Sequence, residues 1–378
     1  MASVHVLPVL NPDGSETAAG AIAAGRASAL FAVLAGVGVA LATGGAGRPP
    51  RNPRLAAAPR TQVGPPATRR AHAAAASALL VRGALVALVG FALVELDPPV
   101  AVILPYYGLL FALATPLLRL RAPVLGALAA VWCVLGPVVS HVLRAGREAL
   151  PGDQPGFGAL GAPGELLREL ALTGYYPVLP WMTYLLAGMA VGRLDLRSSR
   201  VAARLLGGGV VLAVVAAVGS ALLLGPGGGA AVLGPDIAER RYGTVPTDSW
   251  WWLAVEAPHT GTPFDLAHTT GTALALLGAA LLLARVAPAV TWPLAAVGAL
   301  PLTLYTVHVT ALALYPVEAA RASGVSAGTL LGVHLVAALL IGVTLRAAGL
   351  RGPLESVVGA VSGGARRAVA TPPARPAP

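Results

Sequence analysis

The chain has 378 residues, of which 56% are hydrophobic and only 11% are charged, and its net charge is +10. No soluble domain of this length would tolerate that balance, whereas a protein with several membrane spans requires it, so the composition excludes a soluble globular protein. The positive charge comes from 26 arginines and no lysine. An Ala/Gly/Pro-rich composition with arginine in place of lysine is typical of GC-rich coding. The positive charge is therefore no evidence of nucleic-acid binding, and we infer a lipid bilayer as the partner and no nucleic acid.

The first membrane span is predicted close to the N-terminus. Residues 1–10 are apolar but too short to span, and they lack the basic region and cleavage site of a signal peptide. We interpret them as a half-helix stub, the tail of a first helix whose beginning is missing. A turn is predicted at Asn11-Pro-Asp-Gly. The run GRASALFAVLAGVGVALATGG at residues 25–45 then matches the ~20 apolar residues that cross a ~30 Å hydrocarbon core.

A basic, proline-rich loop at residues 45–75 separates this helix from the other apolar runs. Eight further spans are predicted, at about 76–95, 99–118, 123–143, 175–192, 204–224, 266–286, 292–316 and 327–346. The fold class is therefore all-α, a polytopic transmembrane helix bundle with about nine complete spans plus the stub. We expect one transmembrane domain over residues 1–350 and a disordered cytoplasmic tail at 356–378.

The distribution of arginine predicts the orientation. When successive spans alternate, 18 arginines fall on the side of the 45–75 loop, seven fall on the other side, and Arg82 lies within a span. Cytoplasmic loops carry the excess of positive charge, so this loop and the C-terminus are predicted to be cytoplasmic, in a cell (inner) membrane. The two long loops at 144–174 and 225–265 are then extracytoplasmic, where they could cover an external site.

Ionisable groups in or near spans are costly and are therefore the first candidates for function. Six of the seven histidines fall on the outer side of this topology, together with two carboxylates. An outer pocket with imidazole and carboxylate groups has what general acid–base or acyl-transfer chemistry requires. The outer set comprises His5, His141, His259, His268, His308, His334, Glu95 and Asp97.

From this set we predict two catalytic residues, His5 and His308. The substrate-binding candidates are Arg26, Tyr305, Glu95 and His268. Each also has a purely structural interpretation: His308 shares a helix face with Tyr305 and could only bridge helices, and Arg26 could only anchor the outer interface. His334, isolated on an apolar helix, is left outside the candidates.

No metal site is predicted. The histidines have no zinc-site spacing, and the single cysteine, Cys133, lies in an apolar run, which excludes a disulfide framework and a thiol metal site. No phosphate-binding P-loop occurs.

Four stretches in this order carry a family resemblance. They are RASALFAVLAG at 26–36, GYYPVLPWMTYLLAGMAVGR at 174–193, GALPLTLYTVH at 298–308 and RGPLE at 351–355. Together they resemble the bacterial membrane proteins grouped with heparan-α-glucosaminide N-acetyltransferase, with an acyltransferase-like part at 1–200. The part at about 225–360 resembles the DUF418 module of the YeiB-like members.

This resemblance implies a transmembrane acyltransferase. Cytosolic acyl-CoA, such as acetyl-CoA, would be the donor, and an amino sugar or cell-envelope glycan would be the acceptor on the far face. His5 and His308 would then act as base or transient acyl carrier, with Arg26 near the acyl or acceptor oxygen. Cytoplasmic arginines could meet the CoA phosphates or lipid headgroups. Two alternatives stay open: a transporter or flippase for a small polar or lipid-linked molecule, and an inactive membrane scaffold.

Overall fold

Helices make up every regular element of the described chain. The computed structural model describes residues 2–11, 13–44, 68–146, 154–238 and 242–370, and it contains no strand within these ranges. The all-α prediction is confirmed. In chain order, the α-helices are α1 (Ala2–Val6), α2 (Ala18–Ala23), α3 (Arg26–Ala42), α4 (Arg69–Val94), α5 (Leu104–Ala114), α6 (Ala122–Arg144), α7 (Pro163–Arg168), α8 (Val178–Gly192), α9 (Ser199–Leu224), α10 (Gly229–Leu233), α11 (Pro263–Val286), α12 (Pro288–Gly298), α13 (Pro301–Leu314), α14 (Val317–Ala322), α15 (Ala327–Ala347) and α16 (Pro353–Ala370).

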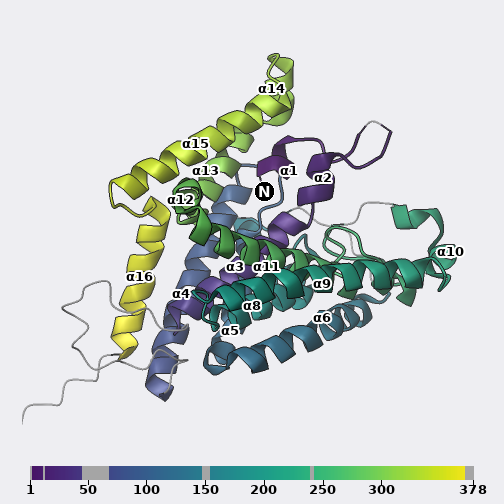
Figure 1. Ribbon diagram of the computed structural model, residues 1–378, viewed down its shortest axis with the longest axis horizontal. Helices are drawn as coiled ribbons and strands as arrows, with labels where there is room; N and C mark the ends of the chain where they lie inside the picture. Colours follow the sequence, from purple (N-terminus) through teal and green to yellow (C-terminus); the bar gives the residue numbers. More distant parts are fainter. Residues whose placement is uncertain (1, 12, 45–67, 147–153, 239–241, 371–378) are drawn as a thin grey trace, which may run out of the picture.

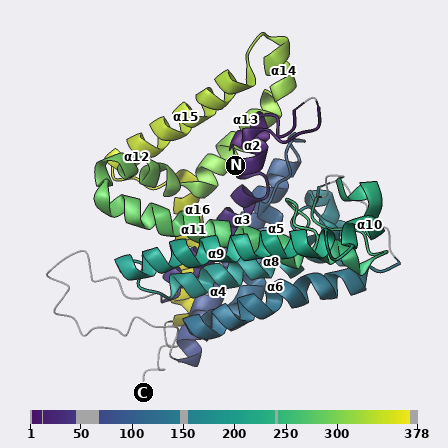
Figure 2. The ribbon, with the colours of Figure 1, turned by 45° about the vertical axis from the view of Figure 1, so that its right-hand side comes forward.

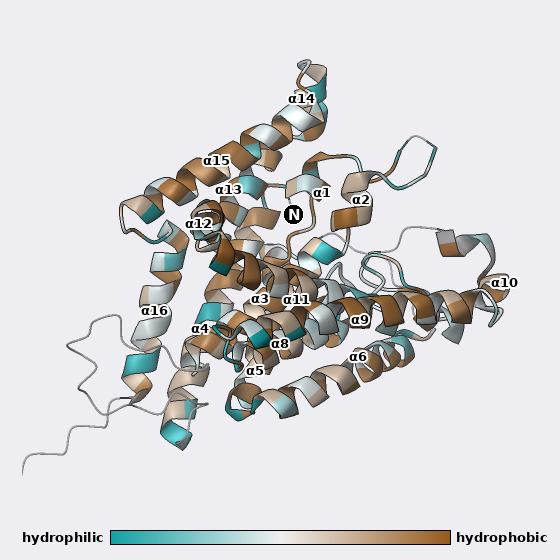
Figure 3. Ribbon diagram, in the orientation of Figure 1, coloured by the Kyte–Doolittle hydropathy of each residue, from teal (hydrophilic) through white to brown (hydrophobic). Residues whose placement is uncertain are grey.

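The long helices have the length and composition of membrane spans. Six helical stretches in the described ranges qualify, and the bent pair α12 and α13 makes a seventh if it is counted as one span. Figure 3 shows apolar residues along the shafts of α9, α11 and α15, and hydrophilic residues mainly near helix ends and on α16. Lipid cannot satisfy exposed backbone groups, so continuous helices of this kind are the structures that a bilayer accepts.

Three of the nine predicted spans differ from simple long helices. The run predicted at 99–118 becomes α5 followed by a 3₁₀ helix, Thr115–Arg119, because Pro98 and Pro99 delay the start and Pro116 follows the end of α5. The run at 175–192 becomes α8, only 15 residues long. The run at 292–316 is broken by a 68° bend just before Pro301.

The bundle has two parts in space. In Figure 1, α3, α6, α8, α9 and α11 run roughly along one direction, while α12 to α15 lie above them and α16 descends beside α4. Figure 2 shows the same separation after a turn of the view, with α1 and α2 between the two parts. Helix α8 is the centre of the lower part, since 13 of its 15 residues are buried. A helix that is apolar and covered on all sides belongs in the core.

Small residues let α3 and α8 approach closely. A Cβ atom at Gly188 would overlap the carbonyl oxygen of Val33, and one at Gly192 would lie 2.6 Å from the Cβ of Ala40. The small-residue steps Gly36/Ala40 and Gly188/Gly192 of the sequence therefore pack against each other. Between membrane helices, where lipid is as apolar as leucine, this close van der Waals packing is a main source of association.

Arginine side chains join the helix ends on the side predicted to be cytoplasmic. Arg193, at the end of α8, donates from Nη1 to the carbonyl of Ala40 (3.0 Å) and from Nη2 to that of Leu118 (2.7 Å). Arg285, near the end of α11, donates to the carbonyl of Arg197. Positive charge at helix C-termini compensates the exposed carbonyls and the helix dipole. The ends that alternation places on one side thus lie together, and these two arginines are engaged in structural contacts.

The predicted disordered tail at 356–378 is wrong as far as residue 370, because residues 353–370 form α16. This helix packs along α4: Arg70 Nε donates to the carbonyl of Val369 (3.1 Å), and Val358 is buried. Its composition is too polar for a span, yet its apolar residues recur on one face and find a partner in α4. Likewise, the predicted loop at 45–75 already becomes α4 at Arg69, while residues 45–67 lie outside the described residues.

Glu355, in the first turn of α16, caps the start of α13. Its Oε1 accepts from the backbone N–H groups of Leu302 (2.7 Å) and Thr303 (3.0 Å), and its Oε2 accepts from the Thr303 hydroxyl. Gly352 is buried beside it, where a Cβ would lie 2.7 Å from the Thr303 Oγ1. The RGPLE stretch therefore satisfies the free donors that the 68° bend leaves at the N-terminus of α13.

Replacing Glu355 with alanine is expected to lower the stability of the protein by about 1–3 kcal/mol, because three donors at a helix start lose a charged acceptor. Thermal unfolding of the detergent-solubilised protein measures this loss. Ser356→Ala, on the exposed neighbour, is the matched control and should stay within about 0.5 kcal/mol of the parent. Equal unfolding temperatures for the two variants would show that the cap is not needed.

Candidate functional site

Three histidine rings form a continuous chain between α1, α13 and α15. Nδ1 of His5 lies 3.0 Å from Nε2 of His308, and Nδ1 of His308 lies 3.1 Å from Nδ1 of His334. The rings of His5 and His308 are stacked at 12° with centroids 5.2 Å apart, and His334 meets His308 edge-on at 4.7 Å. The structure therefore brings the two histidines predicted as catalytic into direct contact and adds His334 to them.

An apolar cluster holds α1 in this place. Val6, next to His5, is 2% exposed and packs with Leu312 of α13, Val317 and Ala320 of α14, and Leu330 of α15. A five-residue helix has no independent stability, so tertiary contacts of this kind must position it. His5 thus reaches His308 because its neighbour is anchored among α13, α14 and α15.

His5 also lines a cavity of about 430 Å³. This volume is in the range of small-molecule sites, which combine apolar walls with a few convergent polar groups. Its apolar lining comes from α1, from the segment before α3 and from the loop before α5. Seven lining residues can form polar contacts through their side chains: His5, Ser28, Gln154, Tyr175, Tyr176, Tyr242 and His259. The cavity therefore has the size of a small-molecule site and a lining that mixes apolar walls with polar side chains.

His259 fastens the loop between α9 and α11 to the start of α3. Its Nε2 accepts a hydrogen bond from the backbone N–H of Gly25 (3.2 Å), which assigns the ring proton to Nδ1 when the ring is neutral. His259 has a φ of 64°, and its carbonyl accepts from the N–H of Gly243 (2.7 Å). A left-handed backbone at a non-glycine residue indicates a position that the surrounding contacts over-determine.

The tyrosines form an aromatic wall that joins two loops predicted to be extracytoplasmic. Tyr175 and Tyr242 have ring centroids 6.1 Å apart, and His259 lies 5.8 Å from Tyr242 and 6.1 Å from Tyr176. The hydroxyl of Tyr176 donates to the carbonyl of Ala101 (3.3 Å). Since these residues come from distant parts of the chain, sequence spacing gave no sign that they meet. The glycine- and proline-rich turns next to Tyr175, Tyr242 and His259 were the signal that could have drawn attention to them.

Burial strongly favours the neutral form of His5. The pKa of this imidazole is lowered from its usual value to about 3, mainly because burial removes water from the charged ring, and secondly because His308 is adjacent. A neutral imidazole has one protonated and one bare nitrogen, so His5 can accept a proton or attack a carbonyl near neutral pH.

None of the four predicted substrate-binding residues lines the cavity, and two of them, Tyr305 and Glu95, make contacts elsewhere. The hydroxyl of Tyr305 accepts from the N–H of Ile103 (3.2 Å) in the buried core. Glu95 accepts from the N–H of Phe157 (2.8 Å) and so ties the end of α4 to the following external loop. Both make structural contacts here, and a binding role for them stays a prediction.

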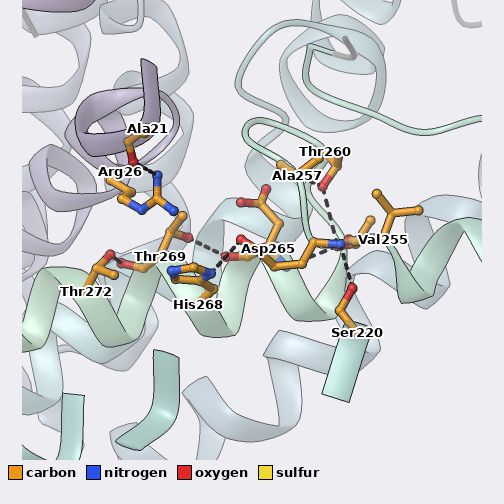
Figure 4. A network of polar contacts seen from close by, with 12 residues as sticks. Ala21, Arg26, Ser220, Val255, Ala257, Thr260, Asp265, His268, Thr269 and Thr272 are labelled. Carbon is orange, nitrogen blue, oxygen red and sulfur yellow. Dashed lines mark hydrogen bonds and ion pairs between the residues drawn. The ribbon is translucent and has the colours of Figure 1, made fainter. Parts of the chain in front are cut away.

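The other two, Arg26 and His268, belong to a polar network beside the start of α11. Arg26 donates to the carbonyl of Ala21 (2.5 Å), and Figure 4 shows it near His268, Asp265 and Thr269. Nδ1 of His268 lies 2.5 Å from Oε1 of Glu256, although the ring N–H is not aligned for a regular hydrogen bond. Asp265 is fully buried and accepts from the N–H of Gly261 (2.9 Å). A binding role for Arg26 and His268 likewise stays a prediction.

The histidine chain does not have the geometry of a metal centre. His308 uses both ring nitrogens on different neighbours, so the three rings do not converge on one point. In the described part of the chain, no group of three or more His, Cys, Asp or Glu side chains could hold a metal ion. The two ring-to-ring contacts, at 3.0 and 3.1 Å, are within hydrogen-bond distance and so suit proton transfer between rings.

Of three comparisons with known proteins, the one with protein families found a match, and it shows the family to which the chain belongs. No curated protein and no solved structure matches it. The family model described as "Heparan-alpha-glucosaminide N-acetyltransferase, catalytic" matches residues 2–224, which is more than half of the chain. The matched range includes α1 with His5 and the helices from α2 to α9. Together with the apolar helices, this match shows that the protein is a multi-pass membrane protein that belongs to the heparan-alpha-glucosaminide N-acetyltransferase catalytic family.

Proposed function

We propose that this chain is a membrane acyltransferase that moves an acyl group from cytosolic acyl-CoA to an acceptor held in the tyrosine-lined cavity. The acceptor is an amino sugar or a cell-envelope glycan, and acetyl-CoA is the donor to test first. The cavity opens on the extracytoplasmic side, as the excess of arginine at the opposite helix ends indicates. The membership of an acyltransferase family supports the reaction class.

One observation carries the proposal: His5 lines the cavity while its Nδ1 is engaged by His308. Its Nε2 is then the nitrogen left for chemistry. As the acceptor nitrogen or oxygen attacks the thioester carbonyl, Nε2 takes the proton of the nucleophile, the carbon–sulfur bond breaks, and the CoA thiolate leaves. In the alternative route, Nε2 of His5 itself attacks the thioester carbonyl, carries the acyl group transiently and then passes it to the acceptor.

The acceptor side of the cavity is supplied by groups that suit a sugar. Tyr175, Tyr176 and Tyr242 offer ring faces and hydroxyls, while Gln154 and Ser28 offer further polar atoms. Gln154 is held by two backbone contacts: its Oε1 accepts from the N–H of Val102 (2.5 Å), and its Nε2 donates to the carbonyl of Val100 (3.1 Å). This lining favours a hydroxylated ligand with an amino group close to His5.

The test uses purified protein in liposomes, with radiolabelled acetyl-CoA on one side and glucosamine on the other. We expect labelled N-acetylglucosamine to appear on the side opposite the donor. Label that remains on the protein would show the acyl–histidine route. Glucosamine that crosses the membrane without label would overturn the proposal in favour of a transporter, and neither movement nor label would favour a scaffold.

A pair of variants on α3 ties this activity to the cavity. Ala27 lines the cavity, so Ala27→Phe should fill it and raise the KM for the acceptor about tenfold or more. Leu34→Phe is the matched control, because Leu34 lies two turns along the same helix and is 41% exposed. Equal KM values for the two variants would place the acceptor elsewhere.

A further inference from the structure

The hydrogen-bond chain of the three histidines has only two neutral arrangements. A neutral imidazole carries one proton, so each ring donates with one nitrogen and accepts with the other. In the first arrangement, the protons sit on Nδ1 of His5, Nδ1 of His308 and Nε2 of His334. In the second, they sit on Nε2 of His5, Nε2 of His308 and Nδ1 of His334. All other combinations leave two facing nitrogens both bare or both protonated across contacts of 3.0 and 3.1 Å.

One proton carried along the chain converts the first arrangement into the second. A proton that arrives on Nε2 of His5 lets Nδ1–H of His5 pass to Nε2 of His308. The Nδ1 proton of His308 then passes to Nδ1 of His334, and the proton on Nε2 of His334 leaves. One proton enters and one leaves, and no ring ends with a charge. The first arrangement must then be restored without carrying the proton back, by rings that part, turn and exchange their protons with water between turnovers.

The proposed reaction requires such an exit when the acceptor is an amine. Near neutral pH the acceptor starts as an ammonium group, and its reaction with a thioester gives an amide, a thiol and one released proton. The ammonium group must lose a proton before its nitrogen can attack. His5 is buried and its cationic form is strongly disfavoured, so a proton left on this ring would hinder the next turnover.

His334 is placed to serve as the outer end. It lies on α15 seven residues after Ala327, which is about 10 Å from the first residue of the helix. His334 is half-buried, and α15 is the least buried of the candidate spans in the described chain. The chain of rings thus runs from the cavity to a helix at the periphery, close to the end that faces the predicted outer interface.

We propose that His5, His308 and His334 form a proton relay that carries the proton of the acceptor from the cavity to the outer rim of the bundle. This inference rests on the proposed acyl transfer. His308 and His334 both lie beyond residues 2–224, so two of the three relay rings come from the part of the chain that the acyltransferase family model does not match. His5 is the residue that meets the substrate, and His308 and His334 act through it.

The first experiment determines, without any substrate, which ring nitrogens of the three histidines carry protons. Protein labelled with ¹⁵N-histidine, in nanodiscs, is compared by nitrogen–proton correlation spectra with His5→Gln, His308→Phe and His334→Gln variants, which also assign the signals. We expect one of the two proton arrangements described above, and we expect His308→Phe to change the tautomer balance of both other rings. A parent with any other combination, or a His5 signal indifferent to His308→Phe, would overturn the relay.

The second experiment measures turnover in the liposome assay. His334→Gln keeps a hydrogen-bonding side chain but cannot pass a proton, so kcat should fall about 10- to 100-fold while both KM values stay unchanged. Added imidazole should restore part of the rate. A kcat equal to the parent's would contradict the relay, as would a loss that imidazole does not repair. His72→Gln, on α4 at the opposite end, is the control for a histidine change as such.

The two experiments separate the two proposals. Coupled tautomers with no acyl transfer in the parent would refute the proposed function and leave the hydrogen-bonded chain in place. Acyl transfer with uncoupled tautomers, and with a normal rate for His334→Gln, would retain the function and refute the relay.

Discussion

The His5→Gln variant is expected to fold like the parent and to transfer acyl groups about 10²–10⁴ times more slowly. The reason is that His5 is the histidine of the three-ring chain that reaches the cavity, and glutamine can replace its hydrogen bond to His308 but cannot accept the proton of the acceptor. The loss corresponds to about 3–5 kcal/mol of transition-state stabilisation. The measurement is kcat with saturating acetyl-CoA and amino sugar.

Two further readouts make this result specific. The KM for the acceptor should change little, because the tyrosine wall and Gln154 remain in place. His72→Gln should keep the parental rate, since His72 lies in the first turn of α4, away from the cavity. A His5→Gln protein that turns over at the parental rate would remove His5 from the reaction and direct attention to His259, the second imidazole of the lining.

The Gly188→Val substitution is expected to cost about 3 kcal/mol or more and to leave little correctly folded protein. The Cβ of any side chain at this position would overlap the carbonyl of Val33, and it would lie 3.0 Å from the Cα of Gly36. Neither backbone can move alone, because α8 is enclosed by its neighbours and α3 carries the lining of the cavity. Overpacking against rigid backbone exceeds the usual cost of a core substitution.

Gly38→Val is the matched control for this helix pair. Gly38 lies on α3, half a turn beyond Gly36, and a Cβ there meets no atom within 4 Å. Valine at this position should change stability by no more than about 0.5 kcal/mol. Thermal unfolding and the monodisperse fraction in size-exclusion chromatography measure both variants. If Gly188→Val melts at the same temperature as Gly38→Val, the close approach of α3 and α8 is not a determinant of the fold.

The sequence predicted the helices better than their ends or their partners. Continuous apolar runs identified the long helices, because lipid imposes a length and a composition on any span. The position of Pro301 was evident, but not the 68° bend, since a proline allows a break without setting its angle. The sequence does not predict helix α16, because its apolar residues are sparse and can be recognised as a packing face only when α4 lies beside them.

The sequence alone can identify those site residues that are unusual where they stand, such as an ionisable side chain in an apolar segment. His5 and His308 stood out as ionisable groups in apolar segments, and the structure places them 3.0 Å apart. His334 could not be distinguished from an isolated packing residue, because its contact with His308 depends on how α13 and α15 meet. The same is true of the cavity wall, which collects residues from seven separate stretches of the chain.

The packing of α16 has a consequence for the connection between α3 and α4. Arg366 of α16 donates to the carbonyl of Ala42 at the end of α3 (3.2 Å), and Val369, one turn later, accepts from Arg70 at the start of α4 (3.1 Å). The end of α3 and the start of α4, which flank the 45–67 segment, are therefore held on adjacent turns of one helix. Because α16 holds these two helix ends, their positions do not depend on the length of the covalent connection between them. Insertions and deletions there should leave the bundle unchanged.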